Sequence, residues 1–280
     1  MPDRILVDTH VHVIASDHSR YPLTPFGGNV GEWVEEHPVT AEQMLTATEA
    51  SGVHHAVLVA AGSAYGVNNS YMADSAAAHP GRFSSACIID MQAPDAADTL
   101  EYWVRERGMR GMRLFTTPDP EAPWLDAAST YPVWQRAETL GIPINAQVAA
   151  KLLPRLRTMI ERFPGVTVAL DHLGNAIRGD STTVPQTLLD LAGLPNAYLK
   201  WSCVNLDAAA QAGVEFRVLF EPLLERFGAE RLLWGSNFPA THHSPYAALV
   251  QQALDATAFV SASERDLLFG GAALKLYHFG

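Results

Sequence analysis

Short apolar runs rich in valine, isoleucine and leucine recur along the chain, and each is followed by a longer stretch with the period of an amphipathic helix. Helices are expected at 40–51, 69–79 and 96–107, among others. Eight strand-then-helix units can be counted. The expected strands are residues 5–13, 55–61, 83–90, 111–115, 142–147, 166–171, 197–202 and 231–236.

Strict alternation of strands and helices predicts parallel strands joined by right-handed crossovers. Eight repeats favour a closed barrel over an open sheet, and 280 residues without a Gly/Ser linker fit one domain over residues 1–280. We therefore predict a single (β/α)₈ TIM barrel with an extra C-terminal helix at 263–277, packed outside the barrel. The Pro- and Gly-rich segment 16–38 is expected to be a long loop that covers the active site.

Composition excludes several classes of protein. Apolar residues make up 48% of the chain and charged residues 18%, which is typical of a globular domain rather than a disordered one. The net charge of −11, with no cluster of lysine or arginine, argues against nucleic acid as a partner. No apolar run is long enough to cross a membrane and the start lacks signal-peptide features, so a cytoplasmic protein is expected. Cys87 and Cys203, in apolar runs, are expected to be buried free thiols.

Two histidines mark the end of the first expected strand, in the sequence DTHVH. Strand alternation points His10 and His12 to the same face, at the catalytic mouth of a barrel. Such a pair can hold a divalent metal or polarise a carbonyl group. The alternative is a pair of hydrogen-bonded core histidines.

A third histidine, His172, follows the apolar sixth strand in the sequence DHLG. It is expected to face the same mouth, which predicts a three-histidine constellation with His10 and His12. The alternative is a side chain that only binds neighbouring backbone groups.

The sequence LLWGSNFP ends the eighth expected strand. Together with DTHVH, YGVNNSYM, HPGRF, RGMRLF, RFPGVTVALDHLG and YLKWS, it makes the chain resemble, over nearly its whole length, the lactonase branch of the amidohydrolases, which includes 2-pyrone-4,6-dicarboxylate lactonases and sugar-acid lactonases. The resemblance implies a hydrolase that opens a lactone, or a related cyclic ester or amide, of a small carboxylated compound. Alternatives are a metal-dependent decarboxylase of aromatic acids and a ligand-binding relative without catalysis.

The family usually has an aspartate, acting as general base, at the position of Asn237. An amide cannot accept a proton near neutral pH, so ordinary base catalysis by this residue is in doubt. A natural subgroup, an engineered substitution and a catalytically silent relative each explain the change. His242 and His243 are the nearest replacement bases in sequence, unless they are simply exposed loop residues; His18 and His37 have weaker claims.

The resemblance also bears on metal binding. Superfamily members with two metals need a lysine at strand four and a histidine at strand five, where this chain has Arg113 and Gln147 nearby. A binuclear centre is therefore disfavoured. One divalent metal, zinc or manganese, held by His10, His12 and His172, and no metal at all both remain open.

Several other residues are candidates for substrate binding. Arg113 lies in an apolar strand, where a buried guanidinium needs an anionic partner: a substrate carboxylate, which the resemblance favours, or a barrel Asp or Glu. The exposed faces of the outer helices are compatible with a homo-oligomer, but the sequence does not fix the oligomeric state. Further candidates at strand ends and in loops are Ser63, Tyr65, Asn69 (alternatively a helix cap), Gln147, Arg178 and Trp201 (alternatively a core residue).

Overall fold

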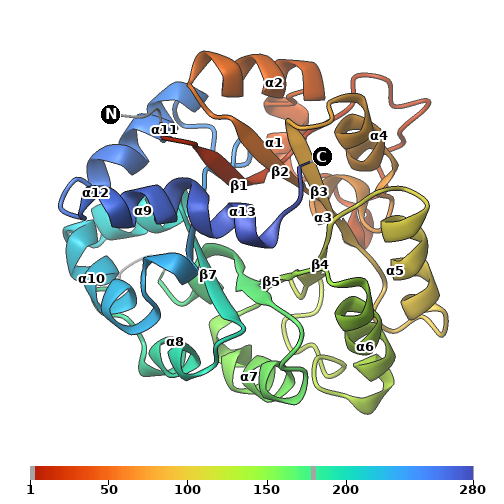
Figure 1. Cartoon of the computed structure of the whole chain (residues 1–280). Helices are drawn as coiled ribbons and strands as arrows, with labels where there is room; N and C mark the ends of the chain where they lie inside the picture. The colour runs from red at the N-terminus through yellow and green to blue at the C-terminus, as the bar shows by residue number, and fades with distance from the viewer. Residues whose placement is uncertain (1–3, 178–180, 280) are drawn as a thin grey trace.

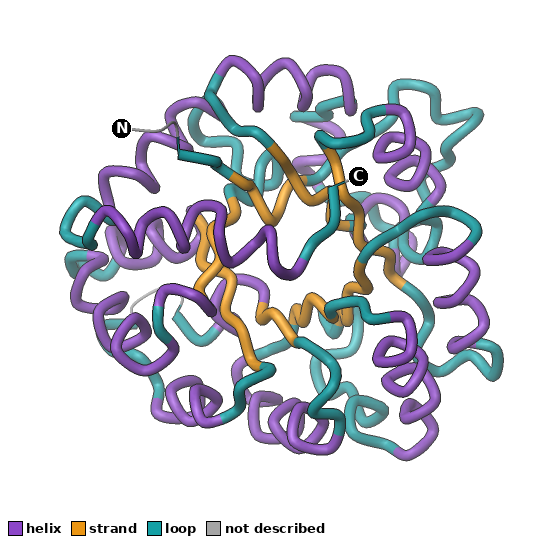
Figure 2. Tube along the Cα trace, in the orientation of Figure 1, coloured by secondary structure: helices purple, strands orange, loops and turns teal. Residues whose placement is uncertain are grey.

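A computed structural model of the chain describes residues 4–177 and 181–279. Eight parallel strands form one sheet in the order β1 to β8, enclosed by helices (Figures 1 and 2). The strands are β1 (Val7–Val11), β2 (His55–Val59), β3 (Phe83–Ile88), β4 (Gly111–Phe115), β5 (Ile144–Gln147), β6 (Val168–Leu170), β7 (Ala197–Ser202) and β8 (Leu232–Gly235).

The helices lie between and after the strands. Short 3₁₀ segments include Phe26–Gly28 and Asp171–Asn175. The α-helices are α1 (Glu32–Glu36), α2 (Ala41–Ala50), α3 (Gly62–Tyr65), α4 (Ser70–Ala78), α5 (Ala96–Arg105), α6 (Tyr131–Leu140), α7 (Leu153–Arg162), α8 (Gln186–Leu189), α9 (Cys203–Gln211), α10 (Phe216–Phe227), α11 (Tyr246–Ala256), α12 (Ala262–Asp266) and α13 (Ala272–Leu276).

The first and last strands meet and close the ring. The His12 N–H donates to the Phe238 carbonyl (2.9 Å), and the Asn237 N–H donates to the His10 carbonyl (2.8 Å). The Thr9 hydroxyl also donates to the Trp234 carbonyl, at 2.7 Å. The predicted (β/α)₈ barrel is thus confirmed. Every observed strand lies within its predicted range.

The segment 16–38 is less irregular than expected. It contains the Phe26–Gly28 turn and α1, which were not predicted because a five-residue helix is too short to show a helical period. The Thr24 N–H and hydroxyl donate to the carbonyls of Ala64 and Tyr65, at 2.9 and 2.8 Å. These bonds tie the segment to α3.

The C-terminal helix lies elsewhere than predicted. Residues 262–276 are helical throughout, with a π-helical turn at Leu267–Gly271, but α13 crosses the amino-terminal end of the barrel instead of packing outside it (Figure 1). Its Ala272, Ala273 and Leu276 are buried with Val7 and Leu233 of the barrel interior. Small apolar side chains let the helix come close enough to cover that end, which explains the difference.

Cys87 and Cys203 are buried and free, as expected. In the described part of the chain, no helix is both long enough and apolar enough to span a membrane.

Asp8 bridges the seam between β1 and β8. Its fully buried carboxylate accepts hydrogen bonds from the N–H groups of His10 (3.0 Å) and Ser236 (2.9 Å) and from the Tyr246 hydroxyl (3.0 Å). Burial outweighs these bonds and raises the pKa of Asp8 to about 6. The folded state therefore holds this proton more tightly than the unfolded chain, and stability is lost as the pH rises from 4 through 6.

We expect Asp8→Asn, which removes the charge and keeps the shape, to be more stable than the parent at pH 7 by up to about 3 kcal/mol. At pH 4 the advantage should nearly disappear. Denaturant unfolding of both proteins at the two pH values measures the difference. An equal difference at both pH values would contradict this explanation.

Candidate active site

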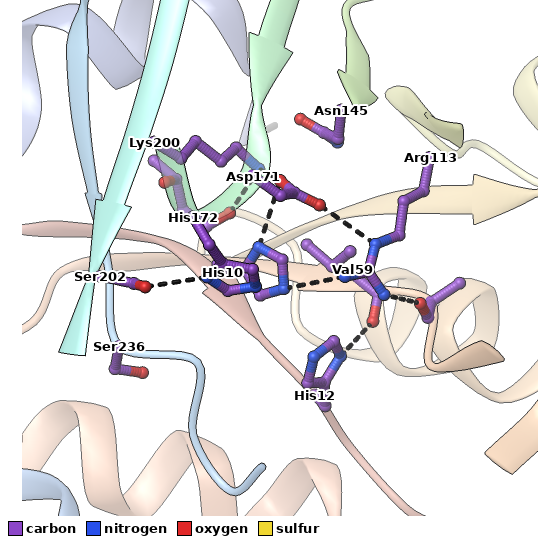
Figure 3. A network of polar contacts seen from close by, with 12 residues as sticks. His10, His12, Val59, Arg113, Asn145, Asp171, His172, Lys200, Ser202 and Ser236 are labelled. Carbon is purple, nitrogen blue, oxygen red and sulfur yellow. Dashed lines mark hydrogen bonds and ion pairs between the residues drawn. The ribbon is translucent and has the colours of Figure 1, made fainter. Parts of the chain in front are cut away.

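A β-bulge in β1 orients the two histidines of DTHVH. Asp8 pairs with Ala56 and Val11 pairs with Leu58, so β1 contains one residue more than β2 between the two pairs. Because of the bulge, Asp8 can form hydrogen bonds across the seam between β1 and β8 while the side chains of His10 and His12 both lie in one buried cluster. This buried cluster, shown in Figure 3, consists of His10, His12, Arg113, Asp171, His172 and Lys200. Their ring centroids are 5.0 Å apart.

His172 is presented by an unusual turn. Residues 172–175 all have positive φ, with values of 53°, 55°, 62° and 51°, although only residue 174 is a glycine. L-residues rarely form consecutive left-handed turns, and such strained backbone concentrates at functional sites. The turn places the His172 ring 4.7 Å from that of His10, and its Nδ1 lies 2.8 Å from the Ser202 hydroxyl.

Asp171 links this cluster to two buried cations (Figure 3). Its Oδ2 lies 3.1 Å from Arg113 Nε, and its Oδ1 lies 3.3 Å from His10 Nδ1 and 3.4 Å from Lys200 Nζ. Lys200 also donates to the Thr9 carbonyl, at 2.9 Å. One carboxylate therefore faces two cationic side chains, and the Asp8 carboxylate, which accepts from the His10 N–H, also interacts with Lys200.

Burial and these contacts set the protonation states. Burial, with a smaller contribution from Arg113, lowers the pKa of His12 to about 3, and burial lowers that of His10 well below its usual value. Both rings are thus neutral near pH 7. Burial opposes ionisation of Asp171, but its contacts with His10, Lys200 and Arg113 together hold its pKa well below the usual range. Burial lowers the pKa of Lys200 to about 8.

The amidohydrolase family profile matches residues 7–279. The chain belongs to this family. An L-fucono-1,5-lactonase of Burkholderia multivorans is 25% identical over 97% of this chain and 95% of its own length. A 4-sulfomuconolactone hydrolase of Rhizobium radiobacter is 26% identical over 85% of this chain and 76% of its own length. A crystal structure of an amidohydrolase from Burkholderia multivorans with bound zinc covers 99% of this chain and 100% of its own, with a TM-score of 0.79 at 20% identity.

The residues of this amidohydrolase do not fit a resident divalent metal. His10 directs Nδ1 toward Asp171, and its Nε2 lies 3.4 Å from Arg113 Nη2, so both ring nitrogens of His10 already face partners within the protein. Asn237 offers a neutral amide and no carboxylate to a divalent cation. In the described ranges 4–177 and 181–279, no group of three or more His, Cys, Asp and Glu side chains has the geometry of a metal site.

Arg113 has its anionic partner within this amidohydrolase. Besides the Asp171 contact, its Nη1 donates to the Ala60 carbonyl at 2.9 Å, and its guanidinium carbon lies 4.9 Å from the centre of the Phe115 ring. The buried charge of Arg113 is thus compensated without a substrate carboxylate. The need for an anionic partner is therefore no longer a reason to expect that Arg113 binds the substrate. Of its five N–H groups, three have partners among the described residues.

Tyr65 and Asn69 form hydrogen bonds with backbone groups of neighbouring segments. The Tyr65 hydroxyl accepts from the Ala15 N–H at 2.8 Å. Asn69 is fully buried; its amide oxygen accepts from the Ile88 N–H (2.8 Å), and its amide nitrogen donates to the Ile88 carbonyl (2.9 Å). Its side chain does not cap α4 either. Both residues are therefore best explained as supports of the strand ends.

The remaining binding candidates are scattered. Trp201 packs in the helix layer, 5.2 Å from the Phe220 ring, in agreement with a core role. Gln147 accepts from the Thr117 hydroxyl at 2.8 Å, and Ser63 is half-buried with its carbonyl bound to the Gly31 N–H at 3.0 Å. Arg178 lies outside the described residues.

The loop after β8 separates Asn237 from the two histidines that follow. Asn237 adopts a left-handed conformation (φ 63°), and its amide donates to the Thr241 hydroxyl at 3.0 Å. His242 is exposed and stacks on His37, with ring centres 4.0 Å apart. His243 is also exposed, and its Nε2 lies 3.7 Å from Asp207 Oδ1. Neither histidine joins the buried cluster, so the suggestion that one of them replaces the base has no support in the contacts of this loop.

Sequence reasoning overlooked Asp171, Lys200 and Ser202. The signal for Lys200 was present: YLKWS places a lysine in an otherwise apolar strand, and the argument used for Arg113 applies equally. Asp171 was counted as the last residue of a strand, although a carboxylate in VALDHLG is just as exceptional. Ser202 carries no comparable signal, because serine is common where a helix begins.

Proposed function

We propose that this amidohydrolase hydrolyses the lactone ring of a small carboxylated compound without a metal. The observation that carries the proposal is the three-histidine cluster backed by Arg113, Asp171 and Lys200. The buried guanidinium of Arg113 beside these histidines suits an anionic substrate and a developing oxyanion. The lactone hydrolases among its relatives support the reaction class.

In this proposal Arg113 and His172 hold the carbonyl oxygen of the lactone. Arg113 is fixed by Asp171 and by the Ala60 carbonyl, and two of its N–H groups have no partner among the described residues. A guanidinium held in this way is oriented before substrate binds, so little reorganisation is needed as charge develops on the oxygen. Ser202 orients His172 through the 2.8 Å contact with Nδ1.

The attacking water loses its proton to His12. The His12 ring is neutral and its Nδ1 lies 2.7 Å from the Val59 carbonyl, which fixes the proton on Nδ1 and leaves a lone pair on Nε2. Water oxygen bonds to the carbonyl carbon while His12 Nε2 takes one proton. The ring C–O bond then breaks, and the leaving alkoxide takes that proton to give the hydroxy acid. Asn237 can orient the water by hydrogen bonding but cannot take its proton.

Steady-state hydrolysis of a panel of carboxylated lactones, with metal content measured in the same preparation, tests the proposal. His172→Ala should lower kcat/KM by about 10²-fold, the range found when one oxyanion donor is removed. His278→Ala changes the same residue type at an exposed position in the C-terminal segment and should leave kcat/KM unchanged.

Unchanged turnover of His172→Ala on a verified substrate would contradict the proposed role of His172 in holding the carbonyl oxygen. Activity that follows the metal content would show that a metal takes part. Release of carbon dioxide from an aromatic acid, without ring opening, would instead identify a decarboxylase.

A further inference from the structure

A cavity of about 210 Å³ lies beside the candidate active site, at the carboxyl ends of β3 and β4. Its walls are mostly apolar, formed by Phe26, Ile88, Met91, Phe115 and Trp124 among others. The Arg113 guanidinium lies 4.9 Å from the centre of the Phe115 ring, so this ring borders both the cavity and the buried cluster. The cavity is therefore placed to receive a part of the substrate that does not react.

The aromatic wall is held in place from two sides. Phe26, from the segment tied to α3 by Thr24, stacks on Phe115 with ring centres 5.9 Å apart and planes 22° from parallel. On the other side, a Cβ atom added to Gly62 would lie 2.5 Å from the Phe115 ring, so the ring packs directly on this glycine. The cavity is thus largely formed before any ligand binds, which reduces the cost of binding.

Charge at the rim limits what the cavity can accept. Its polar lining consists of Asp90, Gln92 and Asp119, and no lysine, arginine or histidine lines it among the described residues. Both carboxylates are fixed by backbone bonds: Asp90 accepts from the Gln92 N–H (2.9 Å) and Asp119 from the Ala122 N–H (3.1 Å). A second carboxylate or a sulfonate would meet repulsion here. An uncharged apolar group would not.

We propose that this cavity is a specificity subsite for an apolar, ring-sized substituent at the far end of the lactone. The inference rests on the proposed lactone hydrolase function and names its substrate class: a lactone with one anionic group and one apolar end. The volume agrees, because a cavity of about 150 Å³ is enough to hold benzene. A phenyl ring or a short alkyl chain therefore fits.

Four δ-lactones that share one ring carboxylate and differ only at C6 test the proposal. The C6 substituents are phenyl, butyl, carboxymethyl and hydrogen. We expect kcat/KM for phenyl and butyl to exceed that for hydrogen by at least about tenfold, the discrimination that a few buried methylenes provide. Carboxymethyl should fall below hydrogen. Equal values, or a preference for carboxymethyl, would overturn the proposal.

A charge variant gives an independent readout. Gln92 is exposed at the rim, so Gln92→Lys adds a cation there without entering the core. It should raise kcat/KM for the carboxymethyl lactone several-fold relative to the phenyl lactone. Gln135→Lys, at an exposed position on α6, is the matched control and should leave all four values unchanged.

Calorimetric binding of the same four lactones separates this proposal from the proposed function. If none is hydrolysed but their Kd values keep the predicted ranking, lactone hydrolysis fails and the subsite stands. If all four are hydrolysed without ranking, the function stands and the subsite fails. If the Kd values show no ranking either, the cavity is not a subsite for apolar groups.

Discussion

Asp171→Ala should abolish detectable turnover and lower the free energy of unfolding by about 3 to 5 kcal/mol. The reason is that Asp171 is fully buried and is the carboxylate that contacts both Arg113 and Lys200. Without it, two cations share the barrel interior without their anionic partner. His10 also loses the group toward which its Nδ1 points. Denaturant unfolding and kcat/KM measure the two effects.

Two further variants make this result specific. Asp98→Ala removes a carboxyl that is 80% exposed, although it contacts Arg136, and should change stability by less than about 0.5 kcal/mol. Asp171→Asn keeps the shape of the side chain, so it should fold better than the alanine variant and still be inactive. A stable Asp171→Ala protein with parental turnover would show that the buried network is dispensable.

Asn237→Asp should raise kcat by about 10²-fold or more, within the range attributed to general acid–base catalysis. In the mechanism proposed for the parent chain, the proton of the attacking water goes to His12. The pKa of His12 is lowered to about 3, mainly by burial, which makes it a weak base. A carboxylate at position 237 supplies a stronger base. The change is conservative for the backbone, because Asn and Asp both tolerate the left-handed conformation at φ 63°. The Thr241 hydroxyl can donate to a carboxylate in place of its present bond.

Steady-state kinetics on a lactone that the parent chain binds gives the measurement. Asn29→Asp introduces the same charge at an exposed position of the segment 16–38 and should not alter kcat. If the parent and Asn237→Asp turn over equally fast, the amide does not limit the reaction and His12 is a sufficient base. If Asn237→Asp binds the lactone and remains inactive, position 237 does not carry the base in this chain.

The fold was predictable because β/α alternation is a property of the local pattern. Apolar runs located all eight strands, and the helical period of the polar and apolar residues between them located α2, α4 and α5. The path of α13 was not predictable in the same way. Its alanines and leucine specify a buried face but not which surface of the barrel will cover it.

The candidate site was also predictable only in part: the sequence indicates its histidines but not their partners. The three histidines stand at strand ends, where the barrel fold itself brings them together. A lysine in YLKWS and an aspartate in VALDHLG indicate that Lys200 and Asp171 need buried partners. Which side chains these partners are depends on the packing of separate strands, which no local pattern shows. The role of Asn69 was not predictable for a related reason. An asparagine before a helix predicts a cap, whereas the side chain of Asn69 binds the backbone of Ile88 at the end of β3.

The placement of α13 has a consequence for the synthesis of this chain. Tyr277, just after the helix, is 1% exposed, and its hydroxyl contacts Asn145 while its ring lies 5.4 Å from Lys200 Nζ. The ring of strands likewise closes only when β1 forms hydrogen bonds with the segment that follows β8. The ribosome must therefore have synthesised everything from β1 through Tyr277 before both contacts can form. Closure of the barrel and burial of its charged interior are expected to be late folding steps that follow the synthesis of β8 and α13.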